Sequence, residues 1–414
     1  MNFKNEVEAL GGKVANVRLN SSLLAFIYLS SAVFIGVDAR VYPAEILLVT
    51  AALILSLKGG TRDSLTTALL LTGTLWFCSV ILSNYATSAP LGSGLKGTMR
   101  AAFVLLDFLA FFKLIPTVRN NESKFLLGMG IAGLSSYFFY PSDYALVSWW
   151  KFGLGVPVTL LIFFFLGRTK GTFKVKIFWI LALATFHFFM GDRSLAITTA
   201  LSGFFVILSG WRWITSRKTI VVALISLCIV SICSVFVTSL YDSLARTGML
   251  GSSALDKISI QSQGAFGSLA TGREEFWLSL DSISQNPLFG VGSYQFASPE
   301  TMSRAAALLE NWGYSASSNS VSDTQRSFHS ELFGMIAENG ILAAPFWIVV
   351  GAVFTLGLVA AMRKRDSWSH FYLFIAFTGL WDLLFSPIGA DRKIWLAATL
   401  ALTIANIRRV NREN

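Results

Sequence analysis

Residues 65–83, LTTALLLTGTLWFCSVILS, decide the fold class. The stretch carries no charged side chain, and a helix of this length spans nearly the whole hydrocarbon core of a bilayer, about 30 Å. Similar apolar runs recur along the 414 residues, which are 54% hydrophobic and only 14% charged. Soluble domains usually carry about a quarter charged residues. The sequence therefore predicts an all-α polytopic membrane protein.

The apolar runs predict about twelve spans joined mostly by short connectors. They group into 1–240 with the first nine spans, 241–329 with one large loop containing short helices, and 330–414 with the last three. We expect spans near residues 22–38, 41–57, 65–83, 98–116, 125–140, 152–167, 175–191, 194–209, 219–240, 341–361, 370–387 and 393–407.

The basic residues set the expected topology. With the N-terminus inside, most of the 33 lysine and arginine residues fall in inner connectors or near the termini, as the positive-inside rule requires. Both termini are thus predicted to be cytoplasmic, and the long loop faces outward. The net charge of +10 follows from these connectors, so no nucleic-acid partner is expected. The three cysteines lie inside apolar runs, which indicates neither disulfides nor a thiolate metal site.

The long loop carries signals for short helices. Thr271 and Glu274 form a capping box, and Asn286-Pro287 ends the helix that it starts. Gly290-Val291-Gly292 predicts a turn. A second helix is expected from Pro299 to Gly313, and residues 328–339 form an amphipathic segment before Gly340. The loop is predicted to be a helical cap lying on the membrane.

Three polar residues near the outer surface are candidates for function. Arg193 follows Asp192 at an outer turn, where it either snorkels to headgroups, pairs with Asp192 or clamps an anion through its guanidinium. Arg273 at a helix start adds its charge to the helix dipole, which suits a phosphate or diphosphate, unless it is simply a solvated arginine. His329 is expected in the first turn of a helix, either as a structural residue or as a neutral base.

Other polar residues at membrane depth have a more ordinary interpretation. His187 and His370 are expected to be structural. Asp107 and Asp382 are candidates for buried acids, which either pack against arginines or form a proton path in a transporter. No nucleotide-binding loop, nucleophile elbow or cluster of metal ligands is present in the sequence, so neither a metal nor a cofactor is expected.

Three segments together resemble the O-antigen ligase and polymerase superfamily. The first is Thr271-Gly-Arg-Glu-Glu-Phe-Trp followed by Asn286-Pro-Leu-Phe-Gly-Val-Gly-Ser-Tyr-Gln-Phe. The second is His329-Ser-Glu-Leu with Gly340-Ile-Leu eleven residues after the histidine, and the third is Asp192-Arg193-Ser194 opening a span rich in small residues. Their order, the single long outer loop and the number of spans all agree with that superfamily.

The resemblance implies a glycosyltransferase of the bacterial inner membrane, with a glycan on undecaprenyl diphosphate as donor. Arg193 and Arg273 would hold the diphosphate, and His329 would deprotonate or orient the acceptor hydroxyl. The donor is already activated, so positioning, charge neutralisation and proton removal suffice, in a metal-independent displacement that inverts the anomeric centre. The acceptor would be lipid A core for a ligase, or a second lipid-linked glycan for a polymerase.

The spacing favours the ligase. Polymerases of the superfamily often carry two long outer loops, each with a glycine at a fixed spacing from an arginine. Here there is one such loop, and Phe204 and Ser284 stand eleven residues after Arg193 and Arg273. A transporter for a lipid-linked or anionic solute, with Asp107, His187 and Asp382 as proton-coupled groups, is the alternative of another class, and a non-catalytic envelope scaffold is a third.

Overall fold

The fold was analysed in a computed structural model. The structure describes residues 21–35, 40–56, 64–118, 120–169, 172–209, 236, 239–249, 274–311, 328, 330–363, 366–389 and 392–413. Over these residues the secondary structure is helical, apart from one isolated bridge between Ile35 and Val41. The predicted all-α class is therefore confirmed.

Most helices follow the predicted apolar runs, but the helix expected at 22–38 ends at Ser30. After a first helix at Ser21–Ser30, they are α2 (Pro43–Ser56), α3 (Ser64–Ala86), α4 (Leu91–Leu114), η1 (Ile115–Thr117), α5 (Asn121–Phe139), α6 (Asp143–Val147), η2 (Trp150–Leu154), α7 (Gly155–Arg168), α8 (Phe173–Phe189), α9 (Arg193–Leu208), α13 (Glu274–Gln285), α14 (Pro299–Asn311), α16 (Glu331–Asn339), η4 (Ile341–Ala343), α17 (Ala344–Arg363), α18 (Ser369–Phe385) and α19 (Arg392–Glu413). The expected span at 219–240 lies almost entirely outside the described residues.

Three helices in the described part of the chain are long and apolar enough to cross a membrane: Ser64–Ala86, Trp150–Arg168 and Ile341–Arg363. Four shorter apolar helices accompany them, at Ser21–Ser30, Pro43–Ile54, Arg193–Leu208 and Ser369–Phe385. A helix rises 1.5 Å per residue, so the 14 residues of α2 cover only about 21 Å. The expected count of twelve spans is thus not confirmed, although the membrane-type composition of the helices is.

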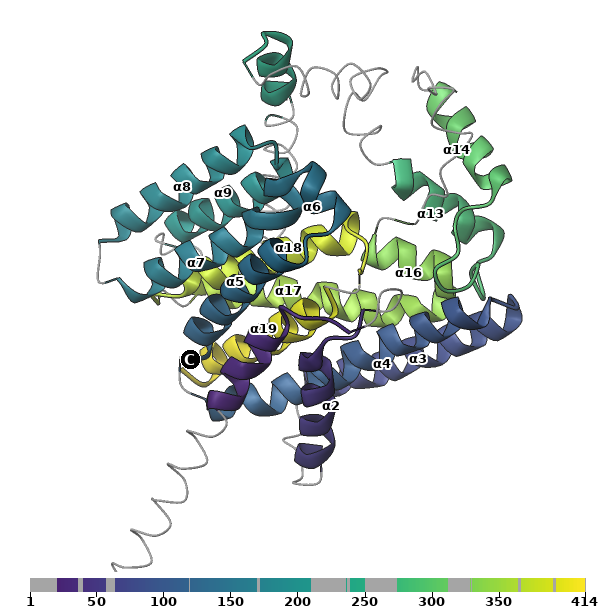
Figure 1. Ribbon diagram of the computed structural model, residues 1–414, viewed down its shortest axis with the longest axis horizontal. Coiled ribbons are helices and arrows are strands. Elements are labelled where there is room, and N and C mark those ends of the chain that lie inside the picture. The colour runs from purple at the N-terminus through teal and green to yellow at the C-terminus, as the bar shows by residue number, and fades with distance from the viewer. Residues whose placement is uncertain are drawn as a thin grey trace, which may run out of the picture.

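The helix α17 runs through the middle of the bundle and packs against α3, α18 and α19 (Figure 1). An aromatic cluster joins it to α3, where the Trp76 ring stacks on Phe346 at 4.8 Å between centroids and meets Trp347 edge-on at 5.1 Å. On either side of this centre, α4 packs against α2 and α19, and α9 against α8 and α18. The interior is therefore a layer of large apolar side chains between helices.

Connectors that the charge pattern predicts to be cytoplasmic meet at one end of the bundle. There the Arg409 guanidinium donates to Glu122 at 3.2 Å and to Asp366 at 2.9 Å. Tyr372 donates its hydroxyl to the same Glu122 at 2.7 Å. These bonds join α5, α18 and α19. We call the opposite end, where α3 turns into α4, α8 into α9 and α18 into α19, the outer end.

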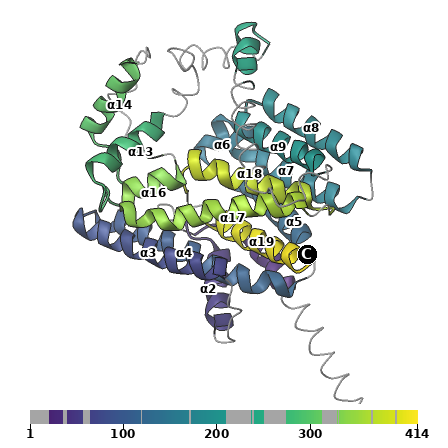
Figure 2. The same ribbon diagram turned by 180° about the vertical axis from the view of Figure 1, so that it is seen from behind.

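The helices of the predicted loop stand at the outer end (Figure 2). The end of α13 at Gln285 and the start of α14 at Pro299 agree with the predicted stop and start signals. Leu278 of α13 and Ala305 of α14 share a small apolar core with Ala337 of α16. The loop helices therefore pack on the bundle through α16, as a cap would.

Candidate functional site

The turn between α8 and α9 carries the first predicted site residue. Asp192 caps α9, because its carboxylate accepts the backbone N–H of Leu195 at 3.1 Å and the Ser194 hydroxyl at 2.8 Å. Arg193 is the first residue of α9, and its guanidinium lies over the ring of Tyr241 at 4.8 Å. This cation–π contact fixes the guanidinium at the outer end, next to a helix N-terminus.

A cluster of charged groups lies beside that turn. Arg392, the first residue of α19, donates to the Asp382 carboxylate of α18 at 2.8 Å. Burial raises the pKa of Asp192, and the positive charges of Lys151 and Arg392 act against this increase. The start of α19 and the start of α9 are therefore close enough to influence each other electrostatically, and Lys151 and Arg392 add positive potential near Arg193.

The same cluster includes the start of α16. Burial and, to a smaller degree, the carboxylate of Asp382 raise the pKa of Glu331, Arg392 opposes them, and the resulting pKa is about 8. Ser330 caps the helix by accepting the Phe333 N–H at 3.0 Å, and it donates to the backbone oxygen of Leu383 at 2.9 Å. The start of α16 is thus tied to the outer end of α18.

The helices α13 and α16 lie side by side in parallel. Near their starts, the rings of Phe276 and Phe333 meet edge-on at 4.9 Å between centroids. Just beyond their ends, the Ile341 N–H donates to the Pro287 oxygen at 2.9 Å. Their N-terminal ends, where helix dipoles and free N–H groups favour anions, therefore lie close together at the outer end.

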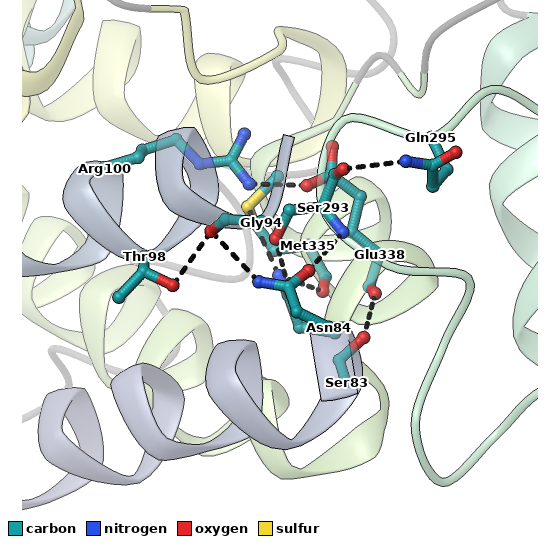
Figure 3. Close-up of polar contacts among 10 residues, drawn as sticks. Ser83, Asn84, Gly94, Thr98, Arg100, Ser293, Gln295, Met335 and Glu338 are labelled. Atoms are coloured by element: carbon teal, nitrogen blue, oxygen red, sulfur yellow. Dashed lines mark hydrogen bonds and ion pairs between the residues drawn. The ribbon is translucent and has the colours of Figure 1, made fainter. Parts of the chain in front are cut away.

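The segment 286–295 is docked against the bundle (Figure 3). The Val291 and Gly292 N–H groups donate to the oxygens of Ala337 and Glu338, both at 2.9 Å. On the other side, the Ser293 N–H donates to the side-chain oxygen of Asn84 at 2.9 Å. This predicted turn segment thus joins the end of α3 to the end of α16.

Two close approaches need glycine. Gly340 has a φ of +79°, and an added Cβ would meet the Leu288 oxygen at 1.9 Å. Gly97 of α4 faces Ser293, whose hydroxyl would lie 2.1 Å from an added Cβ. Gly340 needs both the left-handed backbone conformation and the absence of a side chain, whereas Gly97, inside α4, needs only the absence of a side chain.

A buried ion pair lies next to the docked segment. The guanidinium of Arg100 on α4 pairs with the Glu338 carboxylate on α16 at 2.5 Å (Figure 3). It also lies over the Tyr294 ring at 4.5 Å. Arg100 is only 3% exposed. Arg100 lies well inside α4, which begins nine residues earlier, at Leu91.

Of the three predicted site residues, the structure describes Arg193. Arg273 and His329 lie outside the described residues. Arg273 immediately precedes α13 in the sequence, and His329 precedes the α16 cap Ser330. The helix α16 itself begins at Glu331, so its first turn does not include position 329. The predicted cap at Thr271 is also outside the described residues.

The other two histidines are buried among neighbouring side chains, which agrees with the structural roles expected of them. His187 is buried and receives a hydrogen bond from the indole N–H of Trp150 at 3.0 Å, while Thr159 lies 2.9 Å from its other ring nitrogen. His370 is also buried, against the ring of Phe163.

The two predicted buried acids differ. Asp382 pairs with Arg392, as an acid packed against an arginine would. Asp107 is completely buried in α4, and neither of its carboxylate oxygens has a hydrogen-bond partner among the described residues. The same part of the chain contains no group of three or more metal-ligating side chains.

Sequence reasoning missed Glu331, Glu338 and Arg392 as members of the site. A signal was present for the two glutamates, because both lie inside the motif that runs from His329 to Gly340. The sequence signal for Arg392 was weaker: it is a basic residue in a short outer connector, where the positive-inside rule disfavours basic residues.

The fold and the site together define a membrane-bound, all-helical protein with a cluster of charged groups at its outer end, where the short helices of a long loop also lie. Residues 177–348 match the family model described as O-antigen ligase. The matched segment contains Arg193, the α13–α16 pair and the docked segment, and it confirms the resemblance to the O-antigen ligase and polymerase superfamily. A search of curated proteins gives no significant match. The match indicates an O-antigen ligase type of function, which acts on lipid-linked glycans.

Proposed function

We propose that the protein is a membrane glycosyltransferase that moves a glycan from undecaprenyl diphosphate to a hydroxyl of lipid A core, at the periplasmic face of the bacterial inner membrane. One observation carries the proposal. The N-terminal ends of α13 and α16 lie together, and the α16 end is tied through Ser330 and Asp382 to the charged cluster beside Arg193. In the sequence, the three candidate residues lie at or next to the starts of α9, α13 and α16, and this supports a shared site for them.

Arg193 and Arg273 hold the diphosphate of the donor in this proposal. Guanidinium groups bind phosphate oxygens through charge-assisted hydrogen bonds, and a helix N-terminus next to each arginine adds N–H donors and positive potential. The cation–π contact with Tyr241 holds Arg193 in place before the donor arrives. Lys151 and Arg392 reinforce the positive potential without contacting the donor.

His329 accepts the proton of the acceptor hydroxyl. The hydroxyl oxygen attacks the anomeric carbon, and a new glycosidic bond forms as the bond from that carbon to the diphosphate breaks. The bonding electrons leave with undecaprenyl diphosphate, whose added negative charge the two arginines stabilise. One displacement inverts the anomeric centre, and no covalent intermediate or metal ion takes part.

Reconstitution in proteoliposomes tests the proposal. Purified protein receives an undecaprenyl-diphosphate glycan together with lipid A core or with a second lipid-linked glycan. Glycan on lipid A core supports the ligase, whereas a ladder on the lipid carrier would assign a polymerase with the same donor site. Arg193→Ala, Arg273→Ala and His329→Ala should each abolish transfer while membrane insertion stays normal.

Asp107→Asn is the control variant, because the proposed transfer uses no carboxyl group of α4, the helix that carries Asp107. It should retain transfer. A transporter that uses Asp107 as a proton carrier would instead fail with this variant, and full transfer by the His329 and Arg273 variants would contradict the proposed function.

A further inference from the structure

The Arg100–Glu338 pair connects two helices far apart in the sequence. Arg100 lies in the third turn of α4, and Glu338 is the penultimate residue of α16. Both side chains are almost entirely buried, at 3% and 9% exposure. Because α4 belongs to the bundle and α16 to the region of the proposed site, the pair fixes α16 relative to the bundle at one defined point.

Tyr294 completes this contact. Its φ is +54°, a left-handed conformation that residues other than glycine rarely adopt, and its ring lies under the Arg100 guanidinium. The preceding residue, Ser293, is held on both sides, by the side chain of Asn84 and by the close approach of Gly97. Such a conformation persists only when its surroundings impose it, and it commonly marks a functional constraint.

A buried ion pair gives little net stability, because desolvation of the two charges offsets their attraction. The main effect of the ion pair is on the relative position of the two helices. The pair accepts only one relative placement of α4 and α16, whereas an apolar contact would tolerate sliding. The α16 helix has nine residues and is about 13 Å long, so displacement at Glu338 is transmitted to Ser330 at the other end.

We propose that Arg100, Glu338 and Tyr294 form a positioning lock, which holds the start of α16 in register with the start of α13 for glycan transfer. The inference rests on the proposed function. The three residues do not touch the donor or the acceptor; they act through α16, whose start follows the proposed base directly in the sequence. Loss of the lock therefore lowers the rate of the transfer step and leaves binding of the donor intact.

Two variants test the lock. Glu338→Gln removes one charge and leaves Arg100 buried without its partner, so it can also impair folding. The double variant Arg100→Met with Glu338→Leu replaces the pair by apolar side chains of similar volume, a change that buried ion pairs usually tolerate. The matched control is Arg304→Gln with Asp281→Asn, which removes an exposed ion pair between α14 and α13.

Three quantities are measured for each variant: the thermal unfolding midpoint, the number of donor-binding sites per protein, and kcat and KM for the donor. We expect the Met/Leu variant to keep its unfolding midpoint, its donor sites and its donor KM, with kcat reduced at least tenfold. The control should match the wild type in all of them. Wild-type kcat in the Met/Leu variant, or a decrease only in proportion to lost donor sites, would overturn the lock.

A cysteine cross-link tests the lock independently of activity. Phe276→Cys and Phe333→Cys place thiols at the adjacent starts of α13 and α16, in a background without the native cysteines. The cross-linking yield should fall when the Met/Leu change is added and stay constant with the control change. Failure of the wild type to transfer glycan contradicts the proposed function alone, whereas an unchanged yield contradicts the lock.

Discussion

Glu331 is a carboxyl group in the first turn of α16 that is almost fully buried, at 2% exposure. Its neighbours from the packed elements are Asp382 and Arg392, which already pair with each other. Burial of a second carboxylate beside that pair would leave one negative charge without compensation. The raised pKa, about 8, means that Glu331 keeps a proton at neutral pH.

This proton makes folding stability depend on pH. Between the ordinary pKa of 4.5 and the folded value of about 8, the folded protein binds a proton that the unfolded chain releases. The free energy of unfolding therefore decreases as pH rises through this window, by up to about 1.4 kcal/mol per pH unit. Glu331→Gln should remove most of this decrease.

Thermal unfolding in detergent, recorded from about pH 5 to about pH 9, measures the effect across the window. The control is Glu300→Gln, on the exposed surface of α14, where the pKa is lowered and no proton is taken up in this range. An unfolding midpoint that falls equally steeply in the wild type and in Glu331→Gln would refute the assignment.

At the scale of elements, the junction between α16 and α17 depends on the backbone of Gly340. This residue needs a positive φ and also lies against the backbone of Leu288. Gly340→Ala therefore suffers both conformational strain and a steric clash. We expect it to lower the free energy of unfolding by more than the roughly 1–2 kcal/mol that the left-handed conformation alone costs, and to reduce transfer.

Gly191→Ala separates the two effects, because Gly191 also has a φ of +79° but an added Cβ there would meet nothing within 4 Å. The measurement is the shift of the unfolding midpoint for each variant. Equal shifts would contradict the expected clash between an added Cβ at position 340 and the backbone of Leu288.

Local signals predicted the elements of the loop well. Pro287 lacks a backbone N–H, so the helix α13 ends just before Asn286-Pro287, and Pro299 opens α14. Both proline effects are local to one helical turn, so they can be predicted from the sequence. The start of α4 was missed, since Gly92, Gly94 and Gly97 weaken the helix signal in its first two turns. Packing of α4 against α3 and the docked segment overrides that local preference.

At the scale of the whole molecule, the sequence alone could not reveal which segments meet. Arg100 and Glu338 are 238 positions apart, and neither carries a local signal for the other. The same holds for Glu331, Asp382 and Arg392, which come from three helices. Hydropathy predicted the helices and charge predicted their common outer end, but pairing across the bundle depends on tertiary packing, which only the structure describes.

The central claim is that Arg193, at the start of α9, and Arg273, directly before α13, hold one diphosphate together. Equilibrium binding of undecaprenyl diphosphate to the purified protein tests it most directly. A charge-assisted hydrogen bond contributes about 1.5–3 kcal/mol, so Arg193→Ala and Arg273→Ala should each weaken binding about tenfold or more. His329→Ala should bind like the wild type, because His329 acts on the acceptor.

Lys174→Ala, on an exposed residue of α8 at the opposite end, is the control and should leave the affinity unchanged. The account predicts a loss of affinity confined to the two arginine variants. Wild-type affinity in both of them would contradict it.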